Sequence, residues 1–310
     1  MSKNKTVFLA LLTMLLWGSL FPAVKLGYQA YQVEGAADIL LFAGIRFTVC
    51  GVVICLIALV ADKSSYRAAG HSILPILLAG VFAIVLHYGF TYLGLKWTES
   101  SKTAILKQVG ALFYICFSFL FFREDRPTVK KMVSCGVGFV GILVLHIGPA
   151  GLSFSLGDIL ILCASFCVVF SNVISKKTFE TVSPITFTGI SQLFGGLVLL
   201  AIGASMGGRV HFAWNSSLWL MVYICLASIV SYCVWYGIVK YSALSKLFIM
   251  KFAEPVFGCI FSAVLLGENI WKLRYLIALL LICGSIWMVN GGRHGGNTVS
   301  AGQTPSEKRK

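Results

Sequence analysis

The sequence predicts an all-α integral membrane protein with ten transmembrane helices, arranged as two inverted five-helix repeats. Composition and self-similarity support this fold class. Hydrophobic residues make up 58% of the 310 residues and charged residues only 12%, against roughly 25% charged residues in soluble domains. The mean hydropathy is +0.89. Because a helix needs about 20 residues to cross the hydrocarbon core, a chain of this length has room for about ten spans.

Ten apolar segments are long enough to cross a membrane. They lie near residues 6–26, 38–61, 72–95, 101–122, 128–147, 155–175, 183–205, 216–239, 245–266 and 271–290. Each should be a helix, because hydrocarbon offers the backbone no water and the segments lack the alternation of a barrel strand. The connectors are short and polar, as at 62–67 and 123–127. No small-x-small cleavage site follows Lys5 before Lys25, so we interpret the first segment as an uncleaved span.

The second half of the chain repeats the first. At an offset of 144 residues, Tyr, Lys, Ser and Glu residues coincide, and such residues are scarce in lipid. The pairs include Tyr88 and Tyr232, Tyr92 and Tyr236, Ser101 and Ser245, Lys107 and Lys251, and Glu124 and Glu268. At an offset of 145, Gly44 and Gly51 of the second span coincide with Gly189 and Gly196 of the seventh. This extent of matching indicates an internal duplication.

Five spans in each half place the two halves in opposite orientations. Residues 1–147 and 148–290 would therefore form inverted repeats related by a pseudo-two-fold axis in the membrane plane. Such repeats are typical of secondary transporters, whose substrate site lies near the midplane between the halves. Residues 291–310 are rich in Gly, Ser and Lys, which predicts a disordered cytosolic tail.

The distribution of basic residues predicts the orientation. With the N-terminus in the cytosol, the cytosolic segments hold 16 of the 25 Lys and Arg residues and the external connectors hold six. This bias follows the positive-inside rule and predicts a multi-pass protein of the cell membrane with both termini cytosolic. It also accounts for the net charge of +14 without a nucleic-acid partner, because no folded basic face is present. The remaining three, Arg46, Lys107 and Lys251, lie inside predicted spans.

Several short motifs are shared with known transporters. They are Trp17–Lys25, Arg46, Gly157-Asp158, Ala253-Glu254-Pro255 and Gly267-Glu268. With these motifs the chain resembles the drug/metabolite transporter superfamily, and specifically its ten-helix EamA-type members. The resemblance implies a basket of ten helices that moves small metabolites such as amino acids or drugs. The first repeat departs from the family pattern at Gly110-Ala111 and at Arg123-Glu124, which leaves the substrate open.

Two lysines at the same repeat position are the main candidates for substrate binding. Lys107 and Lys251 each follow the serine that opens their span by six residues. They could extend to the headgroups or pair within the bundle. Alternatively, both could face a shared cavity and bind a carboxylate or phosphate. The spacing from Lys251 to Glu254 and Pro255 also resembles the organic-phosphate branch of the superfamily.

Glu254 and His87 are the candidates for ion coupling. Glu254 lies three residues after Lys251, on the same helical face, so it could neutralise that lysine or exchange protons during transport. His87 lies near the middle of its span and could titrate near neutral pH, or could be a hydrogen-bonded packing residue.

Aromatic stripes form a further set of candidates. Spacing by four residues places Tyr88 beside Tyr92, and Tyr232 beside Tyr236, on one face of each helix. These rings could pack the bundle or line a cavity that binds a ligand. The remaining substrate candidates are Trp235, Asn172 and Gln108. Structural roles are expected for Arg46, Trp17, Pro22, Pro255, Glu124 and Glu268, and the two prolines should kink their helices.

These observations predict a secondary transporter or exporter that works by alternating access. Amino acids or related carboxylates are the expected substrates, with drugs or organic phosphates as alternatives. An intramembrane enzyme would need a convergent catalytic group set, and a channel would need rings from oligomeric symmetry. No Walker motif, nucleophile elbow or metal-ligand cluster is present, so we expect no enzyme activity, cofactor or metal. The expected partners are a small-molecule substrate and the lipid bilayer, with the oligomeric state open.

Overall fold

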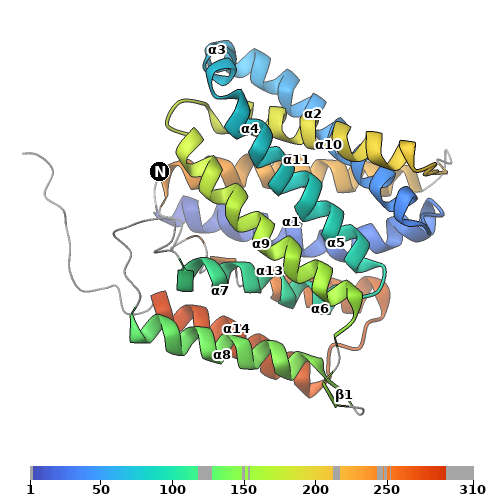
Figure 1. The fold of residues 1–310 in the computed structure, drawn as a ribbon, viewed down its shortest axis with the longest axis vertical. Coiled ribbons are helices and arrows are strands. Elements are labelled where there is room, and N and C mark those ends of the chain that lie inside the picture. Colours follow the sequence, from blue (N-terminus) through green and yellow to red (C-terminus); the bar gives the residue numbers. More distant parts are fainter. Residues whose placement is uncertain are drawn as a thin grey trace, which may run out of the picture.

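The computed structural model describes residues 3–117, 128–148, 151–152, 154–211, 217–242, 247, 250–251 and 253–290. They form a helical bundle (Figure 1). Its first half comprises α1 (Lys3–Ala30), α2 (Ala36–Ala61), α3 (Lys63–His71), α4 (Ile73–Gly80), the π-helix η1 (Val81–Leu86), α5 (His87–Leu95), α6 (Ser100–Leu106), α7 (Gln108–Phe117) and α8 (Val129–His146). Its second half comprises α9 (Leu156–Thr178), α10 (Pro184–Ser205), α11 (Ser217–Tyr241), α13 (Ala253–Leu266) and α14 (Leu273–Asn290).

Many helices of the bundle are long and apolar enough to cross a membrane. Within the described residues, six helical segments are long and apolar enough to cross a membrane, namely 4–30, 36–61, 73–95, 156–178, 184–205 and 218–241. Shorter apolar helices cover 132–144, 253–266 and 273–285. Large apolar side chains such as Val60, Leu74 and Val264 are exposed on the outer surface, where lipid would cover them. The chain is therefore a multi-pass membrane protein.

Two local features of the connectors differ from the sequence prediction. Residues 63–71, predicted as part of a polar connector, form helix α3, because the Asp62 carboxylate accepts a hydrogen bond from the Ser65 amide at 3.1 Å and caps the helix. Hydrogen bonds from the Ser64 hydroxyl and the Ser65 amide lower the pKa of Asp62, so it stays ionised near neutral pH. The connector after α8 forms a short strand pair, β1 (Ile147–Gly148) with β2 (Gly151–Leu152).

The predicted fourth and ninth spans are not continuous helices. A turn at Lys107 separates α6 from α7, and Lys251 also has a turn conformation, with α13 beginning at Ala253. The third span is helical throughout but includes the π-helix η1, which leads directly into His87. Such irregular turns are frequent at functional sites, and all three lead to residues that the sequence singled out.

Helices α2 and α10 pack so closely that their backbones nearly touch. A Cβ atom added to Gly44 would lie 2.3 Å from the Leu200 nitrogen, and one added to Gly51 would lie 2.3 Å from the Leu193 nitrogen. Elsewhere α1 packs against α11 and α13, α9 packs against α5 and α7, and α8 pairs with α14 (Figure 1). Small residues at such contacts are the usual basis of close helix packing in membranes.

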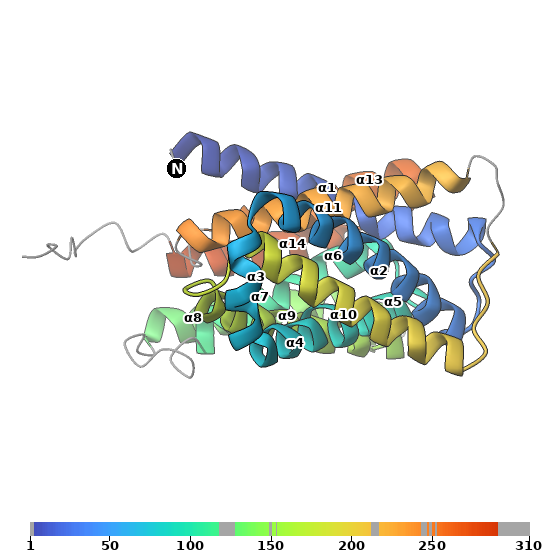
Figure 2. The same cartoon turned by 90° about the horizontal axis from the view of Figure 1, so that it is seen from above.

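The connectors gather at two ends of the bundle, and the long helices run between these ends (Figure 2). At one end, hydrogen bonds join connectors predicted to be external: the His211 amide donates to the Tyr31 carbonyl at 3.2 Å, the Arg209 amide to the Asp38 carboxylate at 2.7 Å, and Lys272 to Glu99 at 3.1 Å. At the other end, the Ser183 amide donates to the Ser65 hydroxyl at 2.9 Å, and Ser72 contacts Thr181 at 3.1 Å.

The α2–α10 contact yields a test of the packing. We predict that Gly51→Ala destabilises the protein by about 1–3 kcal/mol, because the new methyl group would overlap the backbone of α10. The thermal midpoint in detergent, followed by size-exclusion chromatography after heating, measures the effect. Gly136→Ala is the matched control, since a Cβ atom there meets nothing within 4 Å. Equal midpoints for the two variants would contradict the close approach.

Candidate functional site

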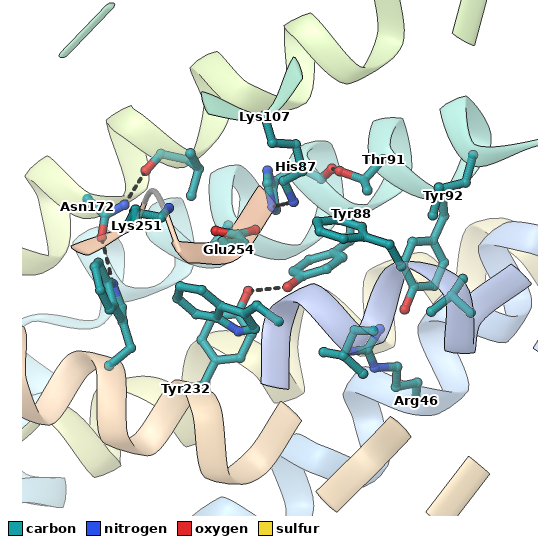
Figure 3. A pocket seen from close by; sticks show the side chains of 18 of the residues that line it. Arg46, His87, Tyr88, Thr91, Tyr92, Lys107, Asn172, Tyr232, Lys251 and Glu254 are labelled. Carbon is teal, nitrogen blue, oxygen red and sulfur yellow. Dashed lines mark hydrogen bonds between the residues drawn. The ribbon is translucent and has the colours of Figure 1, made fainter. Parts of the chain in front are cut away.

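A cavity in the middle of the bundle gathers most of the residues singled out by the sequence. It is lined from α1, α2, η1, α5, α9, α11 and α13, together with the turns at Lys107 and Lys251. The predicted site residues that line it are His87, Tyr88, Tyr92, Lys107, Asn172, Tyr232, Trp235, Tyr236, Lys251 and Glu254. Figure 3 shows these side chains arriving from several helices around one space. Both halves of the chain therefore contribute to the same cavity.

Each of the two lysines lies against a pair of aromatic rings. The ammonium nitrogen of Lys107 is 5.2 Å from the centre of the Phe21 ring and 5.5 Å from that of Tyr88. The ammonium nitrogen of Lys251 is 5.3 Å from the Trp17 ring and 5.5 Å from the Trp235 ring. Rings at this distance attract a cation, by about 2 kcal/mol or more where water is excluded. Both ammonium groups therefore face aromatic rings of the cavity.

His87 links Lys107 to the backbone of α9. Its Nδ1 lies 2.8 Å from the Ala164 carbonyl oxygen, and its Nε2 lies 3.0 Å from the Lys107 ammonium nitrogen. A carbonyl oxygen only accepts, so Nδ1 carries the proton that it donates to Ala164. A protonated Lys107 then donates to Nε2, which leaves His87 neutral. The pair therefore has one proton between the two nitrogens that face each other.

Glu254 and Asn172 add polar groups to the same wall. Glu254 is 4% exposed and lines the cavity beside Lys251 (Figure 3). The Asn172 side chain donates to the Val168 carbonyl at 2.8 Å and accepts from the Trp235 indole N–H at 3.4 Å. These bonds fix the Asn172 amide orientation, because its nitrogen and oxygen have different partners.

Tyr88 of α5 and Tyr232 of α11 meet across the cavity. The Tyr232 hydroxyl donates to the Tyr88 hydroxyl at 2.8 Å, as the dashed line in Figure 3 shows. The two residues are 144 positions apart, which is the offset of the sequence repeat. Tyr236 extends this aromatic wall, with its ring 5.9 Å from that of Tyr232.

Two residues to which the sequence assigned structural roles also line the cavity. Trp17 reaches it from α1 and Arg46 from α2. The Arg46 side chain is fully buried, and its Nε donates to the Ser228 hydroxyl at 3.1 Å. A second guanidinium nitrogen, Nη2, donates to the same hydroxyl.

Other predicted residues lie elsewhere. Gln108 is buried at the start of α7 but does not line the cavity. Pro22 lies inside α1, and Pro255 is buried in α13. Glu268 lies near the external-connector end, where it accepts hydrogen bonds from the Ser100 and Ser101 amides at 2.8 and 2.9 Å. Glu124 lies outside the described residues.

The sequence did not single out several lining residues, among them Phe21, Val24 and Thr91. One signal was available for Phe21. It follows Trp17 by four residues, so both rings lie on one face of α1, and each supports one of the two lysines.

Comparison with known proteins assigns the chain to a family. The model of the EamA-like transporter family matches residues 4–147 and 155–290. The chain belongs to the EamA-like transporter family. Its relatives are named as transporters, so this EamA-like chain is a membrane transporter and not an enzyme.

Two distant relatives and one solved structure each match nearly the whole chain. "Uncharacterized transporter YvbV" of Bacillus subtilis is 26% identical, covering 93% of this chain and 92% of the relative. "Probable amino-acid metabolite efflux pump" of Salmonella typhimurium is 24% identical, covering 94% and 96%. A solved crystal structure shares the fold with a TM-score of 0.67, at 19% identity, covering 93% of this chain and 96% of that one.

Proposed function

We propose that this EamA-like protein is a secondary transporter of small carboxylate metabolites that works by alternating access. The proposal includes ten transmembrane spans in two inverted repeats, residues 1–147 and 148–290, with the central cavity as the substrate site. The single observation that supports it most is that both halves place a lysine and aromatic rings around one buried cavity.

Paired contacts between the halves support the inverted repeat. Gly44 approaches Leu200, and the equivalent residues 145 positions away, Gly189 and Cys55, approach each other as well. Likewise Gly51 meets Leu193 while Gly196 meets Thr48. In an interface with two-fold symmetry, if residue i of one half contacts residue j of the other, the equivalents of i and j also contact each other. The bounds of α8 and α14 also differ by 144 residues at both ends.

Cavity charge supports an anionic substrate group. Arg46, Lys107 and Lys251 are cationic, whereas Glu254 is the lining carboxylate among the described residues. A carboxylate or phosphate of the substrate would complement this charge. Amino-acid metabolites come first, since the Salmonella relative is named as a probable efflux pump for them. Organic phosphates are the second candidate, because the Lys-x-x-Glu-Pro run at 251–255 lies on the cavity wall.

Contacts across the halves at the external-connector end support a gate there. Glu268 from the second half binds the Ser100 and Ser101 amides of the first and lies 3.5 Å from Lys25. Lys102 of the first half pairs with Asp158 of the second at 2.8 Å. In an alternating-access cycle these contacts would break as the two halves rock around the site.

Glu254 and the Lys107–His87 pair are the proposed coupling groups. Both face the cavity, and each can change its charge by gaining or losing one proton. If these groups bind a proton when the cavity opens to one side of the membrane and release it when the cavity opens to the other, substrate movement would be coupled to a proton gradient.

We place the protein in the cell membrane with both termini and residues 291–310 in the cytosol. The positive-inside rule supports this orientation. This orientation requires the cytosolic connectors to lie at one end of the bundle and the external connectors at the other. Hydrogen bonds between connectors of the same predicted side agree with it. External labelling of single cysteines introduced at 151 and 207, in a variant with its reactive native cysteines replaced, should succeed in intact cells. A cysteine introduced at Ser64 is the cytosolic control, and labelling at 151 or 207 only after permeabilisation would overturn the orientation.

The lysines provide the test of substrate binding. We predict that Lys107→Met and Lys251→Met each weaken binding of a transported carboxylate about 10- to 150-fold, which corresponds to the loss of one charged hydrogen bond, about 1.5–3 kcal/mol. Affinity is measured by calorimetry on the purified protein. Lys177→Met, at an exposed position of α9, is the matched control. If both cavity variants fold normally and bind the carboxylate as tightly as the wild type, the lysines serve only helix packing.

A further inference from the structure

We propose that Arg46 forms a second anion-binding position in the cavity, so that the substrate is a small dicarboxylate that bridges Arg46 and the two lysines. This inference rests on the proposed function, because it specifies the substrate class of the same cavity. The sequence assigned a structural role to Arg46, and several features of its surroundings indicate a ligand instead.

Arg46 is a buried cation with an incomplete set of partners. Its side chain is 0% exposed, yet Nη1 has no hydrogen-bond partner among the described residues. Its Nε and Nη2 both donate to the Ser228 hydroxyl, which itself donates to the Ile224 carbonyl at 2.6 Å. No carboxylate lies within 4 Å of Arg46 in the described part of the chain. A buried charge without a counterion is costly, so an anion from outside the chain fits this position.

Aromatic rings surround the Arg46 guanidinium without neutralising it. Its Cζ lies 4.7 Å from the centre of the Phe47 ring and 5.6 Å from the centres of both Tyr88 and Tyr92. Such contacts offset part of the lost hydration but supply no negative charge. They also hold the planar guanidinium in place, which favours binding of a carboxylate by parallel N–H groups.

The two cationic ends are at a separation that suits a short molecule. Arg46 Cζ and Lys107 Nζ lie 5.6 and 5.5 Å from the same ring centre, that of Tyr88. The two charges are therefore at most about 11 Å apart. Charge-assisted hydrogen bonds of about 2.8 Å at each end leave at most about 5 Å between the two anionic groups. A chain of a few carbon atoms, at about 1.5 Å per bond, spans this distance.

Each end of the cavity also offers an unused hydrogen-bond donor. The Trp17 indole N–H, next to Lys251, and the Tyr92 hydroxyl, next to Arg46, are buried without partners in the described structure. Donors at both ends suit acceptor oxygens at both ends of a ligand.

The charges of the cavity match a dianion. With Arg46, Lys107 and Lys251 in their cationic forms and Glu254 as a carboxylate, the lining carries two net positive charges, and the hydrogen bonds of His87 leave it neutral. Two negative charges on the ligand would balance the remaining two positive charges. A monocarboxylate bound to the lysines would leave Arg46 without a counterion.

Calorimetry with a matched ligand pair tests the inference on the full chain in detergent. Succinate and its monomethyl ester have the same carbon chain, but the ester lacks one charge. Wild type should bind succinate about 10- to 150-fold more tightly, the loss expected for one charged hydrogen bond. Arg46→Gln should reduce succinate affinity to that of the ester while leaving ester affinity unchanged. Arg67→Gln, at an exposed position of α3, should change neither.

The possible results separate this inference from the proposed function. If wild type binds both ligands equally and Lys251→Met weakens both, the lysine site stands and the role of Arg46 is wrong. Equal loss of both ligands in a folded Arg46→Gln protein would likewise make Arg46 structural. If Arg46→Gln does not fold, Tyr92→Phe removes only the unused hydroxyl and should selectively weaken succinate. Binding of neither ligand by wild type would overturn both proposals.

Discussion

Positive charge buried between the two halves is the constraint on which the rest of the structure depends. A lysine or arginine in the middle of a membrane span costs about 2.5–3.5 kcal/mol even on insertion scales, and Arg46, Lys107 and Lys251 line one cavity. The surrounding rings of Phe21, Trp17 and Trp235 stabilise the lysines in part. The chain retains these cations at the point where both halves meet, which is where a transported anion would bind.

The helices of the bundle pack closely at the α2–α10 contact and are interrupted at the two lysines. The glycines of α2 and α10 let two helices approach at backbone distance, which provides a fixed contact between the halves. By contrast, the helices carrying the two lysines are interrupted at Lys107 and Lys251. Transporters use such interrupted helices near their substrate sites. In the proposed cycle, the close α2–α10 contact would act as the pivot, and the interrupted segments would rearrange around the substrate.

The sequence predicted most of the cavity because two signals coincide there. Residues such as Lys107, Lys251 and Glu254 are expensive in lipid, so their presence in apolar spans indicates a protein interior. The repeat then places Tyr88 with Tyr232, which are in contact in the structure. The side of each helix that faces the cavity was harder to predict. Helix α2 is apolar on all sides, so its pattern did not show that Arg46 faces the cavity, nor did a span-length argument show the breaks at the lysines.

Counterflow in proteoliposomes tests the central claim, that buried positive charge selects an anionic substrate. Vesicles loaded with succinate, alanine, glycerol phosphate or a lipophilic cation would be assayed for accelerated entry of the same labelled compound. The account predicts exchange of the carboxylates, strongest for succinate, and none of the cation. Exchange of the cation without exchange of any anion would contradict it.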